Sequence, residues 1–141
     1  MEGTYAWLSF LPFEDKGSNP ELDAFLKYDK EPEAFGMQAW LAGEIFARAV
    51  NDAMAAHNDD PNAVTRANVL TAIRGLHHFD ANGLMAETDV GGKSRSACLV
   101  GVQVQHGRFV RVDPPEPGTF DCDNNKPLPA ITIDPFKEYK G

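Results

Sequence analysis

The residues best suited to bind a metal lie together in the sequence: His77, His78 and Asp80. Imidazole and carboxylate groups bind divalent metals, but adjacent histidines point in different directions. The chain also lacks the H-E-x-x-H spacing and the cysteine cluster that complete a tetrahedral zinc site. We therefore interpret this segment as a loop or helix end that favours basic side chains, and we assign it no metal.

Ser94 and Ser96 follow Gly91-Gly92, a spacing that invites comparison with nucleophile and phosphate-binding motifs. No G-x-S-x-G elbow or partnered base accompanies the serines, and no helix with Lys-Ser/Thr follows the glycines. We interpret the remaining acidic candidates as turn and tail charges: Asp59, Asp60, Asp121 and Asp123. We therefore assign no catalytic residue and no cofactor, and paired-carboxylate catalysis stays an open alternative.

Cys98 and Cys122 are the two cysteines of the chain. They form either one disulfide bridge or two buried free thiols, and the residues alone leave both possibilities open. We favour the bridge, which would pin the chain after residue 113 to the preceding hairpin. A closed loop of this size contributes about 3 kcal/mol in the chain-entropy description.

Composition bounds the class of protein. A chain of 141 residues with 43% hydrophobic and 24% charged residues predicts a single folded region. The net charge of −8 argues against nucleic acid and anionic membrane surfaces as partners. No apolar run is long enough to span a bilayer, and MEGTYAWLSF has neither the basic start nor the cleavage site of a signal peptide.

The segment from Glu33 to His57 has the clearest periodicity, and its pattern predicts a long helix. Apolar residues recur at i+4 steps at Met37, Leu41, Ile45, Ala49 and Ala53. They are flanked by Phe35, Trp40, Phe46, Val50 and Met54. Pro32 precedes the helix and Asn58 to Pro61 ends it with turn residues. Because the apolar stripe is broad, we expect the rest of the chain to cover it.

Two shorter helices are predicted on either side of the long one. The first starts after Asn19, a good N-cap, with Pro20 at the first helical position. The second starts after Thr65, and its inward residues are expected to be Val69, Leu70, Ile73 and Leu76. An Asn82-Gly83 turn follows.

Strands are predicted near both ends of the chain. Gly3 to Phe10 is apolar at nearly every position, which favours a strand buried on both faces of a parallel sheet. Its sheet partners are expected to come from elsewhere. Residues 97–112 alternate around His106-Gly107 and predict a β-hairpin, and Ala130 to Ile133 is a further strand candidate.

Five segments together resemble one known family. They are EGTYAWLSFLPF, EAFGMQAWLAGEIFARAV, TRANVLTAIRGLHHFDANGL, SACLVGVQVQHGRFVRVDP and GTFDC. Their order and spacing are similar to the C-terminal part of the extracytoplasmic solute-binding proteins of ABC importers, in the branched-chain amino-acid-binding (type I periplasmic binding protein) group. The resemblance covers nearly the whole chain and strengthens the disulfide prediction.

This resemblance implies an α/β fold that is part of a Rossmann-like lobe: a strand, three helices, a C-terminal β-hairpin and an extended tail. The chain would then be one region, with a crossover strand at 1–13, helices at 19–80 and the closing hairpin and tail at 97–141. The resemblance also implies capture of a small amino-acid-like solute outside the cytoplasm and its delivery to an ABC permease, without enzyme activity. Most ligand-clamping residues of such a bilobal protein would lie outside these 141 residues.

The resemblance nominates three ligand-binding residues. Phe35 matches an aromatic at the start of a cleft-lining helix, while Ser9 and Phe10 stand where the first strand would reach the cleft. The alternative interpretation of Phe35 is a core aromatic. Because a partial bilobal fold leaves apolar surface uncovered, we expect a homo-oligomer or strand-exchanged dimer.

Three other functions stay open at this point. A ligand-sensing module would carry a signalling domain. A small stand-alone enzyme would show strongly shifted carboxylates or a metal in a concave pocket. A structural oligomerising domain would show an extensive apolar interface without a pocket.

Overall fold

The computed structural model describes residues 2–123 of the chain. The predicted strand from Ala130 to Ile133 lies outside the described residues. The helices are α1 (Pro20–Tyr28), α2 (Ala34–Ala55) and α3 (Arg66–Gly75), with short 3₁₀ turns η1 (Phe13–Asp15) and η2 (Pro61–Ala63). The strands are β1 (Tyr5–Leu8), β2 (Val100–Gln105) and β3 (Arg108–Asp113). The prediction of a mixed α/β chain is confirmed.

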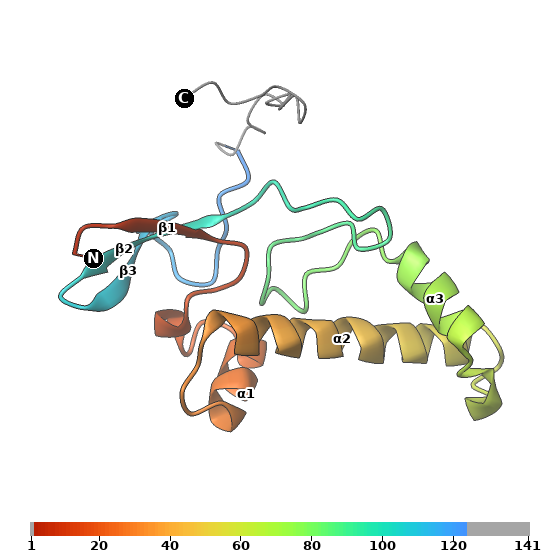
Figure 1. Ribbon diagram of the computed structural model, residues 1–141. Helices are drawn as coiled ribbons and strands as arrows, with labels where there is room; N and C mark the ends of the chain where they lie inside the picture. The colour runs from red at the N-terminus through yellow and green to blue at the C-terminus, as the bar shows by residue number, and fades with distance from the viewer. Residues whose placement is uncertain (1, 124–141) are drawn as a thin grey trace, which may run out of the picture.

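Helix α2 runs along the length of the molecule and organises the rest (Figure 1). Helix α1 lies against its N-terminal end and α3 against its C-terminal end, while the sheet stands on the side opposite α1. After α3 the chain returns along α2 to the sheet as an irregular segment, residues 76–99. None of the helices among residues 2–123 has the length and apolar character needed to cross a lipid bilayer.

The three predicted helices form where their caps indicated. The Asn19 side chain accepts hydrogen bonds from the backbone N–H groups of Glu21 and Leu22, at 2.8 and 3.1 Å. It also donates to the Asn82 carbonyl at 3.0 Å, which ties the start of α1 to the predicted Asn82-Gly83 turn. Thr65 caps α3 through the Asn68 N–H. Both caps satisfy N–H groups that have no partner inside their helix.

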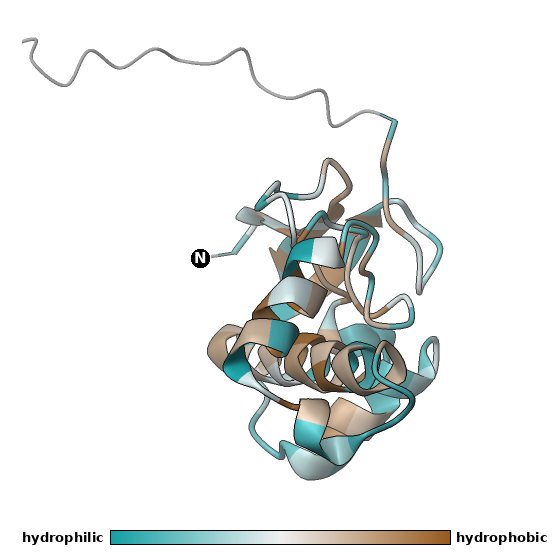
Figure 2. Cartoon of the chain, turned by 90° about the vertical axis from the view of Figure 1, so that its right-hand side faces the viewer, coloured by the Kyte–Doolittle hydropathy of each residue, from teal (hydrophilic) through white to brown (hydrophobic). Residues whose placement is uncertain are grey.

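The apolar stripe of α2 faces the core as the periodicity predicted. Met37, Leu41, Ala49 and Ala53 are buried and Ile45 is half-buried. The main core cluster joins this stripe to the segment after β1, to α1 and to residues 79–84. Brown, hydrophobic ribbon is prominent in α2 and in the strands, with teal in the connections (Figure 2). The expectation that residue 70 faces inward is wrong, because Leu70 is exposed at the outer side of α3.

The predicted hairpin is confirmed, and it gains a third strand. Strands β2 and β3 pair antiparallel around His106 and Gly107, whose φ values of 53° and 75° form the tight turn. Strand β1 pairs antiparallel with β2, so the sheet has the order β1-β2-β3. Two expectations about the first strand are therefore wrong: it is not parallel, and its partner lies within this chain.

The first strand is also not buried on both faces. Tyr5 and Trp7 are 59% and 53% exposed, while Ala6 and Leu8 on the other face are half-buried. Trp7 lies over Gly101 on β2, where an added Cβ would stand 2.9 Å from the indole ring. The near-continuous apolar run therefore reflects an aromatic outer face on an edge strand.

A buried ion pair joins strand β3 to η1. Arg111 and Asp15 have side chains that are only 7% and 5% exposed, and the Arg111 Nε and Nη2 atoms both contact the Asp15 carboxylate. Arg111 Nη1 donates to the carbonyls of Pro114 and Thr119 at 3.0 Å. The Gly118 N–H donates to Asp15 at 3.1 Å. Each charge is thus paired and hydrogen-bonded, the arrangement that buried charges require.

Candidate functional site

The structure places the three predicted ligand-binding residues on two different segments. Ser9 is exposed just after β1, and its backbone carbonyl accepts from the Ala86 N–H at 2.9 Å. Phe10 is buried and stacks on Phe13, with ring centroids 6.0 Å apart. Phe35 is 76% exposed on the first turn of α2. Among the described residues, no hydrogen bond or ring contact joins Phe35 to the other two.

The two adjacent histidines point to separate carboxylates, as their adjacency indicated. His77 Nδ1 lies 2.8 Å from Asp89, and His78 Nδ1 lies 3.0 Å from Glu87. The loop passes too close to the end of α3 for a side chain at Gly91, because a Cβ there would stand 2.2 Å from the Arg74 carbonyl oxygen. Within residues 2–123 no group of three or more His, Cys, Asp or Glu side chains is placed to hold a metal ion.

The loop 77–92 should respond to pH in two opposite ways. The hydrogen bond and charge of Glu87 raise the pKa of His78 above 6.5, so this pair stabilises the loop fully below 6.5 and weakens as pH rises through the raised pKa. The Gly92 N–H and then His77 lower the pKa of Asp89 below 3.8, so its contribution is lost only as pH falls through the lowered pKa. Between pH 3.8 and 6.5, the ordinary pKa values of the two groups, both contributions are fully present.

Two-dimensional NMR titration of the histidine rings measures this directly. In Glu87→Gln the pKa of His78 should fall toward its ordinary value, whereas the remote Asp59→Asn substitution should leave it unchanged. An unchanged His78 pKa in the Glu87 variant would contradict the assignment of the cause.

The two cysteines are joined by a disulfide, Cys98–Cys122, in agreement with the favoured prediction. Next to it, Leu99 and Asp121 form a two-way backbone bridge with N–H···O distances of 3.0 and 2.9 Å. The bridge and the disulfide together hold the segment after β3 against the start of β2.

An open hollow lies between α1 and α2 and has a volume of about 660 Å³. This size falls within the range of about 300–1,000 Å³ that small-molecule sites occupy. Three aromatic residues supply its wall: Phe25 and Tyr28 from α1 and Trp40 from α2. Their rings form a continuous cluster, with centroids 5.8 Å apart for Phe25 and Trp40 and 6.0 Å for Tyr28 and Trp40. We call this hollow the α1–α2 groove.

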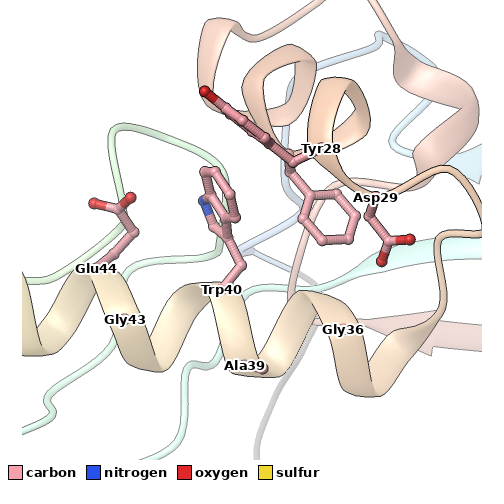
Figure 3. Close-up of a pocket in the computed structure, with 8 residues that line it drawn as sticks. Tyr28, Asp29, Gly36, Ala39, Trp40, Gly43 and Glu44 are labelled. Carbon is pink, nitrogen blue, oxygen red and sulfur yellow. The ribbon is translucent and has the colours of Figure 1, made fainter.

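Two carboxylates and a run of small residues complete the α1–α2 groove. In Figure 3, Trp40 rises from α2 between Glu44 on one side and Tyr28 and Asp29 on the other. Gly36, Ala39 and Gly43 line the same face of α2 without long side chains. The groove therefore combines aromatic faces with negative charge at both ends.

The Nε1 atom of Trp40 is buried and has no hydrogen-bond partner among the described residues. A buried unpaired donor costs about 1–3 kcal/mol, so such atoms are uncommon in folded proteins. This donor belongs to a residue that lines the groove and also packs against the main core cluster.

A second hollow of about 450 Å³ lies between η1 and the C-terminal end of α1. Its lining mixes Phe13, Leu26 and Pro32 with charges of both signs, including Lys16, Lys30 and Glu14. It therefore presents no consistent preference for one ligand charge. None of Ser9, Phe10 and Phe35 lines either hollow.

Sequence reasoning missed the groove and the buried ion pair. Phe25 lies on α1 and Trp40 on α2, and periodicity does not report which two helix faces meet. Asp15 lies in a polar segment whose residue types indicate only a turn, and Arg111 is 96 residues away from it.

A comparison of the chain with protein-family models, curated proteins and solved structures finds no match.

Proposed function

We propose that these residues are the C-terminal portion of an extracytoplasmic solute-binding protein of an ABC importer. In this proposal they belong to the branched-chain amino-acid-binding group and form part of a type I periplasmic-binding-protein lobe. The protein captures a small amino-acid-like solute and delivers it to a membrane permease, without catalysis. The proposal rests on the five sequence segments that resemble this group, on the exposed Phe35 ring and on the exposed apolar residues of β1 and β3.

The observation that carries the proposal is the exposure of Phe35. A core aromatic at this position would be buried, yet the ring is 76% exposed at the N-terminal end of the longest helix. An exposed ring on a rigid helix is well suited to line a cleft that a second lobe closes. Ser9 is also exposed, whereas the buried Phe10 would act by supporting the segment that carries Ser9.

Uncovered apolar surface supports the same proposal. Tyr5 and Trp7 on β1 and Phe109, Val110 and Val112 on β3 are exposed, and both strands are edges of the described sheet. Exposed apolar edge strands favour pairing with another chain or domain. In the full bilobal protein the remaining parts of the lobes would cover this surface.

NMR titration of the chain with amino acids and small organic acids tests the role of Phe35. We expect at least one solute, at millimolar concentration, to shift amide resonances in the first turn of α2, because the exposed ring offers an apolar face to its side chain. Phe35→Ala should abolish these shifts, whereas Phe46→Ala, an exposed aromatic further along the same helix, should preserve them. No shift for any solute, or equal loss in both variants, would contradict the proposal.

Self-association is the second expected result, because the chain alone leaves its sheet uncovered. We expect size-exclusion chromatography with light scattering to show a dimer or larger species. Val110→Lys, which places a charge on the exposed edge strand β3, should return the chain to a monomer. Val64→Lys, an exposed residue before α3, is the matched control. A monomeric wild-type chain at micromolar concentration would contradict this expectation.

A further inference from the structure

We propose that the α1–α2 groove binds a small organic ammonium ion. This site is separate from the cleft proposed around Phe35, since Phe35 does not line the groove. The proposal therefore does not depend on the function proposed above.

The aromatic wall supplies the first argument. Cations are attracted to the faces of tryptophan and tyrosine rings, and aromatic pockets recognise quaternary ammonium groups in this way. Tyr28 and Trp40 stack on each other, with centroids 6.0 Å apart and ring planes inclined by 29°. Both rings line the groove and Tyr28 is 72% exposed, so ring surface outside this stack is open to a ligand. The chain itself uses one of these rings: Lys27 Nζ stands 5.8 Å from the centroid of Tyr28.

The charges supply the second argument. The charged side chains that line the groove are Asp29 and Glu44, and both are carboxylates. Gly36 leaves room for the Asp29 carboxylate, since an added Cβ would stand 2.7 Å from Asp29 Oδ2. An anion would be repelled from both carboxylates, whereas a cation would be attracted to them. Asp29 Oδ1 accepts from the Glu31 N–H at 3.1 Å. Lys27 is a positive charge already placed against the Tyr28 ring, and it competes for that ring.

The size of the groove supplies the third argument. A small organic ammonium ion such as choline matches the aromatic faces and the carboxylates. The groove volume of about 660 Å³ accommodates a free solute of this size.

The test is a fluorescence titration with choline in a Trp7→Phe background, which leaves Trp40 as the fluorophore. We expect saturable quenching of Trp40. The uncharged carbon isostere 3,3-dimethyl-1-butanol should bind at least about tenfold more weakly, because it lacks the charge that the rings and carboxylates attract. Glu44→Gln should weaken choline binding, and Lys27→Met should strengthen it by removing the competing ammonium.

A blocking variant separates binding from folding. A Cβ at Gly43 meets no atom within 4 Å, so Gly43→Leu projects into the groove and also raises helix propensity. It should abolish quenching while the chain keeps its melting temperature or gains stability, and Ala47→Leu on the next turn should bind as wild type. Equal affinity for choline and its isostere, or unchanged binding in Gly43→Leu, would overturn the proposal. Binding to phosphatidylcholine vesicles in place of free choline would overturn the assignment to a free solute.

Discussion

Replacing Asp15 by asparagine is expected to lower the free energy of unfolding by about 3–5 kcal/mol, because it leaves the buried Arg111 guanidinium without a counter-charge. Both side chains are more than nine-tenths buried. The lost carboxylate also accepts from the Gly118 N–H, so its removal disturbs η1, β3 and the loop after β3 together. Equilibrium urea denaturation followed by circular dichroism measures the change.

Two variants make this result specific to the buried pair. Asp23→Asn removes a nearby carboxylate that accepts from the Gly17 N–H at the surface, and it should cost less than about 1 kcal/mol. The double variant Asp15→Leu with Arg111→Met replaces both charges by apolar groups and should recover much of the loss. If Asp15→Asn unfolds at the same urea concentration as the wild type, the ion pair does not stabilise the fold.

Removing the Cys98–Cys122 disulfide is expected to lower the free energy of unfolding by about 3 kcal/mol. The bond closes a loop across a sequence separation of 24 residues and so restricts the unfolded chain. It also holds the Leu99–Asp121 backbone bridge at the start of β2. The measurement is urea denaturation of the Cys98→Ser, Cys122→Ser double variant beside the wild type, with and without reductant.

Reductant should bring the wild type to the stability of the double variant and should leave the double variant unchanged. That internal control separates the disulfide from any other effect of the two serines. Equal midpoints for the oxidised wild type and the double variant would show that the bond does not stabilise the fold.

The sequence predicted the features that depend on neighbours in the chain. Asn19 and Thr65 start their helices, and His106-Gly107 turns the hairpin, because cap and turn preferences act over three or four residues. The i+4 pattern from Met37 to Ala53 identified the buried face of α2 for the same reason.

The features that depend on distant segments were not predicted. Nothing in the residues around Tyr5 indicates that β1 pairs with β2, about a hundred positions later, rather than with a parallel neighbour. The apolar character of Trp7 suggested burial, whereas its ring covers Gly101 from the outer side of the sheet. The α1–α2 groove likewise exists only because two helix faces meet, which no local pattern specifies.

The pairing of β1 with β2 has a consequence for the order in which the chain folds. The backbone bond from the Val104 N–H to the Thr4 carbonyl closes a loop that contains all three helices. Contacts across such a distance form slowly, because the chain must give up much of its freedom before the pairing stabilises it. We therefore expect the helices to form first during synthesis. The pairing of β1 with β2 is expected only after the hairpin has been synthesised.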